Sequence, residues 1–371
     1  MKTKPHVYIL CGEASGDLHA ANLVAAWKQL NPAIDFRAWG GDRLQAEGVQ
    51  LDKHIRELSF MGFWEVFKNL PLIRKQFKSI QNQLLSQKPD LLVLVDYPGF
   101  NLRMAKWAKD HGIRVLYYIS PTVWAWKQNR VFKIQKYVDQ LFCILPFEPA
   151  FYAKFGIKVQ YFGHPLLDEI KRYQHQSKTV NHETKPVLAL LPGSRKQELE
   201  RILPSMLQAS KAFEQSNQVV LVCAPHIPMS YYQSFGLGTE LECVQSHTYD
   251  TLQRADMALV TSGTATLETA LFEVPQVVCY KSSGLSIWLA RKIVKIKFIS
   301  LVNLILDKRA VTELIQETCT VEQMTLELNK IAPETKGRQE QLANYQALKS
   351  QLSLQEAPSH LIAKSMNAYL S

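Results

Sequence analysis

Acidic side chains that come directly after apolar segments are the first candidates for chemistry in this 371-residue chain. Asp96 follows the fully apolar segment Leu91–Val95 and opens the sequence Asp-Tyr-Pro-Gly-Phe-Asn. Such a carboxylate is partly desolvated, which raises its pKa and suits it to act as the general base for a sugar hydroxyl group. The alternative role of Asp96 is that of a turn residue or a helix cap before Leu102, and we favour the catalytic role.

A turn with two glycines connects the first predicted strand to the helix after it, in the sequence Cys-Gly-Glu-Ala-Ser-Gly-Asp (residues 11–17). Backbone N–H groups of such a turn can bind an anion at the helix N-terminus. The alternative is a tight turn in which a side chain caps the helix. Because a carboxylate at a strand end rarely serves packing, Glu13 is the second catalytic candidate. We expect acceptor or loop contacts from Ser15, Gly16, Asp17 and His19. His19 is also a secondary candidate for the general acid or base.

A loop with two tryptophans follows another apolar segment. Ser120 and a proline end the predicted strand Arg114–Ile119, and Trp124 and Trp126 come next. Two such rings in one loop can form an apolar wall or a surface on which a sugar stacks. Packing between domains explains them equally well. Ser120, Trp124 and Trp126 are therefore expected to contact the acceptor or to line the loop.

A Pro-Gly-Ser-Arg turn in the second half of the chain has the composition of a diphosphate site. It follows the apolar segment Val187–Leu191 and precedes a predicted helix. Gly193 and Ser194 can expose backbone N–H groups, and Arg195 can form paired hydrogen bonds to a phosphate. A capped helix with solvated charges explains this combination less well.

A second turn of this kind lies about 70 residues further along, again between a predicted strand and a helix. Ser262, Gly263 and Thr264 are small residues that can form a phosphate cradle. Glu268, about one helical turn into the helix, can accept hydrogen bonds from ribose hydroxyl groups. Neither turn is specific alone, but together they predict a UDP-sugar pocket.

Short apolar runs that alternate with longer amphipathic segments position all these turns. Continuous apolar runs are typical of parallel strands that helices cover on both faces. The predicted strands are Val7–Cys11, Leu91–Val95, Arg114–Ile119, Gln140–Leu145, Val187–Leu191, Val219–Ala224, Cys243–Val244, Met257–Val260 and Gln276–Tyr280. The predicted helices are Leu18–Leu30, Leu102–His111, Glu198–Gln215 and one that begins near Thr264.

A polar stretch, Tyr173–Lys185, interrupts this pattern and is interpreted as a linker or surface loop. The predicted fold class is therefore α/β, with two Rossmann-like parallel-sheet domains facing a cleft and ligands at the carboxyl ends of strands. We expect an N-terminal domain over residues 1–170 on the acceptor and membrane side, and a C-terminal domain over residues 171–340 on the UDP-sugar side. A helical segment over residues 341–371 is expected to pack on the first domain or on a partner.

The composition limits the function classes. The net charge of +10 favours phosphorylated or anionic partners, and we find no nucleic-acid-binding signature. The six cysteines form no Cys-x-x-Cys pair and there is no Asp-x-Asp pair, so neither a disulfide framework nor a metal site is expected. Because no segment has the features of a signal peptide or the length of a membrane span, we expect a cytoplasmic protein.

The motifs together resemble one family. The chain contains, in this order, CGEASGD, VDYPGFN, YYISPTVWAW, LPFE, GHPLLD, LLPGSRKQELE and TSGTATLE. Along nearly its whole length it is similar to lipid-A-disaccharide synthases, which are inverting glycosyltransferases of the GT-B type. The resemblance implies that UDP-2,3-diacylglucosamine is joined to 2,3-diacylglucosamine 1-phosphate (lipid X). The products are UDP and the β-1′,6-linked disaccharide of lipid A (lipopolysaccharide) biosynthesis.

The resemblance also assigns residues. By motif, the family's essential aspartate falls on Asp96 and its diphosphate-binding arginine on Arg195. The family commonly has Pro-Asn-Leu where this chain has Val-Asn-Leu, and Asn303 is kept as a UDP-sugar contact. We expect a direct displacement in which Asp96 takes the proton of the acceptor's 6-hydroxyl group. Arg195 and the two glycine turns would stabilise the departing UDP, so that no metal or cofactor is required.

Two segments that are both apolar and basic remain, Phe60–Lys75 and Ile287–Phe298. Such segments can lie in a membrane interface or guide acyl chains, and the alternative is two ordinary core helices with solvated lysines. Because both substrates carry acyl chains and phosphates, we expect peripheral association with lipid at the inner face of the inner membrane. The oligomeric state stays open.

Two other functions fit parts of the pattern. A UDP-N-acetylglucosamine 2-epimerase shares the two-domain architecture and similar glycine turns, but the basic apolar segments and the tryptophan loop argue against it. A non-catalytic nucleotide-sugar sensor is the second alternative, and the presence of both Asp96 and Arg195 argues against it.

Overall fold

The computed structural model describes residues 4–57, 70–176, 185–238, 241–282, 297–353 and 356–370. The chain divides into two compact units, unit 1 (Met1–Glu169 and Leu352–Ser371) and unit 2 (Ile170–Gln351). The two apolar and basic segments fall mostly outside the described residues, which include only 70–75 of the first and 297–298 of the second. Within the described ranges, no helix combines the length and the apolar character that a membrane crossing needs.

Unit 1 contains a parallel sheet with the strand order β3-β2-β1-β4-β5-β6-β7. Every residue of β4 is buried, which explains its uninterrupted apolar sequence. The strands are β1 (His6–Cys11), β2 (Asp35–Gly40), β3 (Gln50–His54), β4 (Leu91–Val95), β5 (Arg114–Tyr118), β6 (Gln140–Cys143) and β7 (Gln160–Tyr161).

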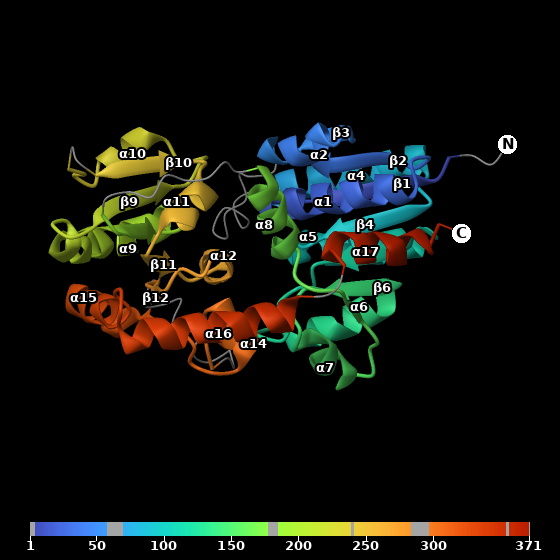
Figure 1. Cartoon of the computed structure of the whole chain (residues 1–371). Helices are drawn as coiled ribbons and strands as arrows, with labels where there is room; N and C mark the ends of the chain where they lie inside the picture. Colours follow the sequence, from blue (N-terminus) through green and yellow to red (C-terminus); the bar gives the residue numbers. More distant parts are fainter. Residues whose placement is uncertain are drawn as a thin grey trace. The chain divides into compact units, whose positions relative to one another are not determined.

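Helices cover this sheet, and the last helix of the chain is one of them (Figure 1). Helix α17 packs on α1, and the indole nitrogen Nε1 of Trp27 donates a hydrogen bond to Asn367 at 3.1 Å. The end of the chain thereby completes the core of unit 1. The helices are α1 (Ala14–Leu30), α2 (Asp42–Ala46), η1 (Ile55–Glu57), α4 (Leu70–Gln87), α5 (Pro98–Asp110), η2 (Gln128–Arg130), α6 (Val131–Tyr137), α7 (Glu148–Ala153) and α17 (Pro358–Asn367).

Unit 2 contains a second parallel sheet, with the strand order β10-β9-β8-β11-β12-β13. Helix α16 is fixed to β12, because the N–H of Gln276 donates to the side chain of Gln341 at 2.8 Å and that side chain donates back at 3.1 Å. The strands are β8 (Val187–Leu191), β9 (Gln218–Cys223), β10 (Glu242–Gln245), β11 (Met257–Thr261), β12 (Gln276–Tyr280) and β13 (Thr312–Ile315).

The helices of unit 2 begin with α8, which spans the end of unit 1 and the start of unit 2. They are α8 (Leu166–Gln176), α9 (Lys196–Ser210), η3 (Lys211–Phe213), α10 (Met229–Gln233), α11 (Thr248–Arg254), α12 (Thr264–Leu271), α14 (Leu301–Leu306), η4 (Gln316–Thr318), α15 (Val321–Lys330) and α16 (Lys336–Leu352).

The predicted α/β class with two parallel sheets is confirmed. The prediction that Tyr173–Lys185 is a loop is wrong for its first four residues, which belong to α8, while residues 177–184 lie outside the described ranges. The ring of Tyr173 packs against Tyr249 at 5.4 Å and Phe272 at 5.8 Å. These tertiary contacts hold the helix where the local composition is polar.

Candidate functional site

In each sheet the strand order reverses at the centre, between β1 and β4 in unit 1 and between β8 and β11 in unit 2. Ligands of open parallel sheets bind outside the carboxyl ends of the strands at such a reversal point. The strand ends are in register, with Cys11 paired to Val95 and Leu191 paired to Val260. The predicted turns therefore lie at the two reversal points, two in each unit.

Asp96 and Glu13 lie close enough at the reversal point of unit 1 for their charges to interact. Burial, followed by the negative charge of Glu13, raises the pKa of Asp96 to about 6, although a hydrogen bond from the N–H of Tyr97 lowers it. Glu13 is exposed at the N-cap of α1, where its side chain makes no capping hydrogen bond. At neutral pH Asp96 is deprotonated and is a stronger base than an ordinary aspartate, as a general base requires.

Three hydrogen bonds fix the backbone of Asp96. Its N–H donates to the carbonyl of Tyr118 at 3.0 Å, and its carbonyl accepts from the Tyr117 hydroxyl at 2.6 Å and from Asn101 Nδ2 at 2.7 Å. Asp96 and Tyr97 have φ values of 45° and 49°, which residues with a Cβ rarely adopt. Tyr117 and Asn101 therefore support the carboxylate, although we did not predict either as a site residue. The position of Asn101 at the end of the VDYPGFN motif was the available signal.

The glycines of the turn 11–17 serve the packing of neighbouring side chains, in addition to the anion binding that the sequence predicts. A Cβ added to Gly12 would lie 2.3 Å from Cγ of Tyr97, so this glycine makes room for the tyrosine ring. Gly16 is buried against Val95, whereas Ser15 is exposed in the first turn of α1. Ser15 is thus the polar residue of this turn, besides Glu13, that is exposed to solvent.

Asp17 has a structural role that differs from the expected acceptor contact. Its side chain is buried, and its carboxylate accepts from the N–H groups of Gly41 at 2.6 Å, Arg43 at 3.0 Å and Leu44 at 3.3 Å. These N–H groups belong to the N-terminus of α2, which has no intrahelical acceptors for them. Asp17 therefore caps α2 and not its own helix, because the peptide groups that it satisfies lie 24 to 27 residues further along the chain.

His19 is buried inside unit 1, and its burial argues against a role as the general base. Burial lowers the pKa of His19 to about 4, and the pKa of the neighbouring His164 falls to about 3 because of burial and the proximity of His19. His19 is therefore neutral at neutral pH and a weaker base than Asp96. Its Nδ1 atom has no hydrogen-bond partner among the described residues.

The tryptophan loop lies partly buried after β5. The hydroxyl group of Ser120 is buried and hydrogen-bonded to the hydroxyl of Tyr152 at 2.7 Å. The ring of Trp124 packs edge-on against Phe147 with the centroids 5.0 Å apart. The ring of Trp126 has Lys127 Nζ 4.4 Å from its centroid, with Arg130 at 5.4 Å. The two tryptophans therefore have different environments, since Trp124 packs on another aromatic ring and Trp126 lies beside two cations.

Glu148 is a buried acid that we did not predict as a site residue. It is 1% exposed, and burial raises its pKa to about 7 although hydrogen bonds from the N–H groups of Leu145 and Ile144, and the nearby polar groups of Ser120 and Trp124, lower it. The available signal was its position in the LPFE motif shortly after a buried strand, which is also where Asp96 lies relative to β4.

The first turn of unit 2 holds a carboxylate where the sequence predicts an anion site. Glu198 Oε2 accepts from the N–H groups of Ser194 and Arg195, both at 3.2 Å, and a Cβ added to Gly193 would lie 2.5 Å from this oxygen. The Arg195 guanidinium is 3.4 Å from the other Glu198 oxygen, and its side chain is 77% exposed. The guanidinium is accessible to a phosphate, but the two N–H groups become available only if Glu198 moves.

In the second turn of unit 2, some polar groups are hydrogen-bonded within the unit and others are accessible to a ligand. Ser262 uses both of its donors inside unit 2, since its N–H donates to the carbonyl of Cys279 at 3.0 Å and its hydroxyl donates to that of Ile299 at 2.9 Å. The expected phosphate contact of Ser262 is therefore replaced by a structural role. Gly263 and Thr264 are exposed, and a Cβ added to Gly263 would meet no atom within 4 Å. The first N–H groups of α12 have no intrahelical acceptor and can bind an anion.

Glu268 and Asn303 differ in how much of their side chains a ligand can reach. Glu268 is half-buried, and its Oε1 accepts from the Tyr249 hydroxyl at 2.9 Å. Asn303 is completely buried; its Nδ2 donates to Val311 at 3.0 Å and to Glu313 at 2.8 Å, and its Oδ1 accepts from two N–H groups at 2.7 and 2.9 Å. The prediction that Asn303 contacts the UDP-sugar is therefore corrected, because every polar group of its side chain is used inside unit 2.

Solved structures share the two-domain fold at low sequence identity. A UDP-N-acetylglucosamine 2-epimerase of Methanocaldococcus jannaschii, in complex with UDP-GlcNAc and UDP, has a TM-score of 0.67 and 13% identity, and the match covers 98% of this chain and 99% of that one. A glycosyltransferase of kitacinnamycin has a TM-score of 0.65 and 11% identity, and the match covers 99% of each chain. At these identities the likeness shows the fold alone, and it confirms the predicted GT-B architecture.

Sequence relatives are much closer. The chain is 38% identical over 361 residues to the lipid-A-disaccharide synthase of Myxococcus xanthus (strain DK1622), with 95% of this chain and 94% of the relative covered. It is 38% identical over 358 residues to that of Nitrosococcus oceani, with 94% and 92% covered. The family model described as Lipid-A-disaccharide synthetase matches residues 7–365. With the motifs at the ends of the central strands in both units, these matches show that the chain belongs to the lipid-A-disaccharide synthase family.

Proposed function

We propose that Asp96 is the general base, and Arg195 the main ligand of the leaving group, in the joining of UDP-2,3-diacylglucosamine to 2,3-diacylglucosamine 1-phosphate. Membership of the family gives the overall reaction, the synthesis of the lipid A disaccharide by a UDP-sugar glycosyltransferase. The observation that carries the assignment of the base is the raised pKa of Asp96 beside Glu13, at the reversal point of the sheet.

Unit 1 activates the acceptor in this proposal. The Asp96 carboxylate takes the proton of the acceptor's 6-hydroxyl group while the hydroxyl oxygen attacks the anomeric carbon of the donor from the side opposite to UDP. The bond from the anomeric carbon to the diphosphate oxygen breaks at the same time, so the configuration inverts and the negative charge passes to UDP. Glu13 contributes by its charge, because it makes Asp96 more basic.

Unit 2 binds the donor and stabilises the charge on the departing UDP. The exposed guanidinium of Arg195 forms paired hydrogen bonds to the diphosphate, and the N-terminus of α12 at Gly263 and Thr264 contributes N–H groups. Glu198 releases the N–H groups of the first turn when the diphosphate binds. We assign the ribose hydroxyl groups to Glu268.

Release of UDP by the purified protein tests the proposal, measured with UDP-2,3-diacylglucosamine in the presence and absence of 2,3-diacylglucosamine 1-phosphate. We expect release that depends on the acceptor, together with a disaccharide 1-phosphate in the mass spectrum. Asp96→Asn should reduce turnover by about 10²- to 10⁴-fold with little change in UDP affinity. Asp35→Asn is the matched control, because Asp35 is exposed at the amino end of β2. Turnover of Asp96→Asn within a few-fold of the wild type would remove Asp96 from the role of base.

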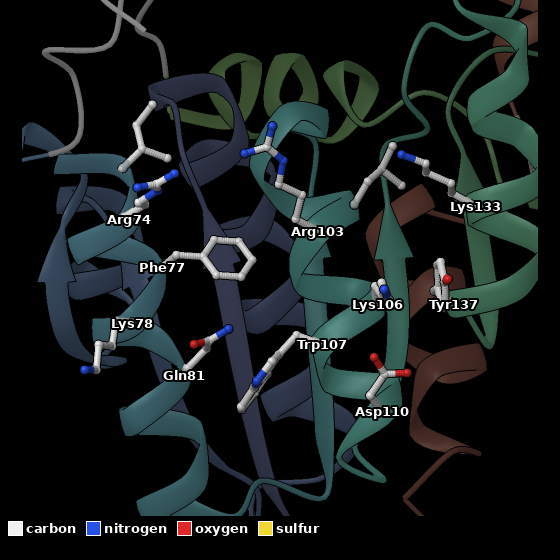
Figure 2. A pocket seen from close by; sticks show the side chains of 12 residues that line it. Arg74, Phe77, Lys78, Gln81, Arg103, Lys106, Trp107, Asp110, Lys133 and Tyr137 are labelled. Carbon is white, nitrogen blue, oxygen red and sulfur yellow. The ribbon is translucent and has the colours of Figure 1, made fainter. Parts of the chain in front are cut away.

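A lipid surface is the partner that we propose for a groove on unit 1, which has a volume of about 750 Å³. Phe77 and Trp107 lie in this groove between α4 and α5, and Figure 2 shows Phe77 reaching from α4 toward α5. The cations Arg74, Lys78, Arg103, Lys106 and Lys133 are exposed around it, against one acid, Asp110. Anionic lipid headgroups attract basic residues by about 1 kcal/mol each, and aromatic rings can enter the interface.

Binding to phospholipid vesicles tests this part of the proposal. We expect the protein to bind vesicles that contain phosphatidylglycerol more tightly than vesicles of phosphatidylcholine alone, with an affinity that falls as salt is added. The double variant Arg103→Glu and Lys106→Glu should reduce binding at least tenfold. The control replaces two exposed lysines of unit 1 outside the groove, Lys154→Glu and Lys364→Glu. Equal losses for both double variants would show that net charge, and not the groove, attracts the lipid.

A further inference from the structure

The turn after β6 contains a buried carboxyl group to which the proposed reaction gives no role. Glu148 is the first residue of α7, and its Oε2 accepts from the N–H groups of Ile144 at 3.1 Å and Leu145 at 2.9 Å. Burying a carboxyl group is unfavourable unless its hydrogen bonds are satisfied. These bonds close the turn between β6 and α7 and fix the carboxyl group at the carboxyl end of the sheet.

The same carboxyl group reaches the tryptophan loop on the neighbouring strand. The Ser120 hydroxyl lies close enough to Glu148 to help lower its pKa. This hydroxyl is paired with the Tyr152 hydroxyl at 2.7 Å and donates to the carbonyl of Pro121 at 3.1 Å. The indole N–H of Trp124 is buried beside Glu148, although its geometry falls short of a full hydrogen bond. Phe147, the residue before Glu148, packs on the ring of Trp124 at 5.0 Å. Glu148 and its neighbour thus contact both ends of the segment 120–124.

This network continues toward the candidate base. Burial, followed by the proximity of Asp96 and Tyr152, raises the pKa of Tyr117. The Tyr117 hydroxyl donates to the carbonyl of Asp96 at 2.6 Å. The residues come from the ends of three adjacent strands, β4, β5 and β6, which are paired in register. The tryptophan loop and the residues that support Asp96 therefore lie side by side at the carboxyl ends of neighbouring strands.

We infer that Glu148 is a positioning residue that holds the loop 119–126 in the arrangement in which it contacts the acceptor sugar. The inference rests on the proposed function, because the acceptor contacts of Ser120, Trp124 and Trp126 are themselves proposed. A residue that only closed the turn between β6 and α7 would need the two backbone hydrogen bonds but neither Ser120 nor Trp124. The contact with the loop is what distinguishes a positioning role from one confined to this turn.

Limited proteolysis and steady-state kinetics test the inference on the full chain. Lys127 is exposed at the end of the loop and provides a tryptic site, while Lys211, exposed in unit 2, provides an internal reference. In Glu148→Ala we expect cleavage after Lys127 to become at least fivefold faster relative to cleavage after Lys211. The acceptor KM should rise about tenfold, with donor KM and kcat within about threefold of the wild type.

If Glu148→Ala does not fold, two more conservative variants still test the inference. Glu148→Gln retains an oxygen for the two backbone N–H groups and an amide group for Ser120, so it should restore both readouts to within about twofold. Tyr152→Phe removes only the hydroxyl that pairs with Ser120 and should shift both readouts in the direction of Glu148→Ala. Lys154→Ala, an exposed change at the other end of α7, is the control that should alter neither.

Each outcome separates the inference from the proposed function. Unchanged cleavage after Lys127 in both Glu148→Ala and Tyr152→Phe would overturn the inference. Faster cleavage with an unchanged acceptor KM would also overturn it, because the loop would be held without serving the acceptor. Failure of the proposed function would appear instead in the wild type, as an absence of acceptor-dependent UDP release.

Discussion

Glu13 lies beside Asp96 at the carboxyl end of the central strands of unit 1, and its negative charge adds to burial in raising the pKa of Asp96 to about 6. Two carboxylates that approach each other disfavour ionisation of the more buried one. A substitution of the exposed Glu13 should therefore change the pKa of the buried Asp96. The hydrogen bonds from Tyr117 and Asn101 to the Asp96 backbone would remain.

The first prediction concerns Glu13→Gln, which removes the neighbouring charge and should lower the pKa of Asp96. Because the reaction uses deprotonated Asp96, kcat falls as the pH drops through this pKa, and the acid limb of the pH profile should shift to lower pH in the variant. The measurement is kcat between pH 4.5 and 8 with saturating donor and acceptor. An acid limb that does not move, or that moves to higher pH, would contradict the interaction.

The second prediction concerns Glu198, which occupies the N–H groups of Ser194 and Arg195. Glu198→Gln keeps an oxygen for these groups but removes a negative charge from the turn where we place the diphosphate. UDP affinity should therefore increase about three- to tenfold, as isothermal titration calorimetry can measure. Weaker binding would instead mean that the Glu198 charge holds Arg195 in its binding position. Glu200→Gln is the control, because Glu200 is exposed on the same helix.

The third prediction tests the structural role of Asn303. Asn303→Ala leaves the N–H groups of Ala310 and Val311 without their acceptor, which should destabilise unit 2 by about 3 kcal/mol. Asn344→Ala is the control, since its side chain makes one bond, at 3.3 Å, to the same segment. We expect a lower melting temperature for Asn303→Ala and unchanged UDP affinity in the folded protein. A tenfold loss of UDP affinity at an unchanged melting temperature would return Asn303 to the pocket.

The sequence predicts the strands that are fully buried and the turns that follow them. Strands β4, β8 and β12 have the predicted bounds, because buried parallel strands are uninterrupted apolar runs with abrupt polar ends. Strands β2, β3 and β13 were not predicted, since they contain polar residues at partly exposed positions. The positions of Asp96 and Arg195 follow from this pattern, because each comes after a predicted strand.

What the sequence could not predict is which candidate side chains are already hydrogen-bonded. Asp17 binds N–H groups that begin at Gly41, and Ser262 donates to Ile299, 37 residues further along. Composition and spacing describe neighbours along the chain, whereas these partners become neighbours only when the sheet forms. For the same reason a motif cannot tell an aspartate that caps a helix from one that faces a substrate.

The last prediction follows from the two buried histidines, His19 on α1 and His164 before α8. Their folded-state pKa values are about 4 and about 3, against roughly 6.5 in an unfolded chain, so below pH 6.5 the unfolded chain binds more protons. Stability is then fully present above pH 6.5 and falls as the pH drops toward 4, by up to about 1.4 kcal/mol per pH unit for each histidine.

His19→Leu should remove one of these contributions, and denaturant unfolding at a series of pH values from 4 to 7 measures it. The acids Asp17, Asp168 and Glu169 lie on the elements around the histidines, and the raised pKa values of Asp96 and Glu148 act in the opposite direction. The quantity to compare is therefore the difference between variant and wild type, with the exposed His175→Gln as control. The free energy of unfolding of His19→Leu should decline less steeply below pH 6.5. An identical decline in variant and wild type would mean that His19 is protonated in the folded protein, and that its burial does not keep it neutral.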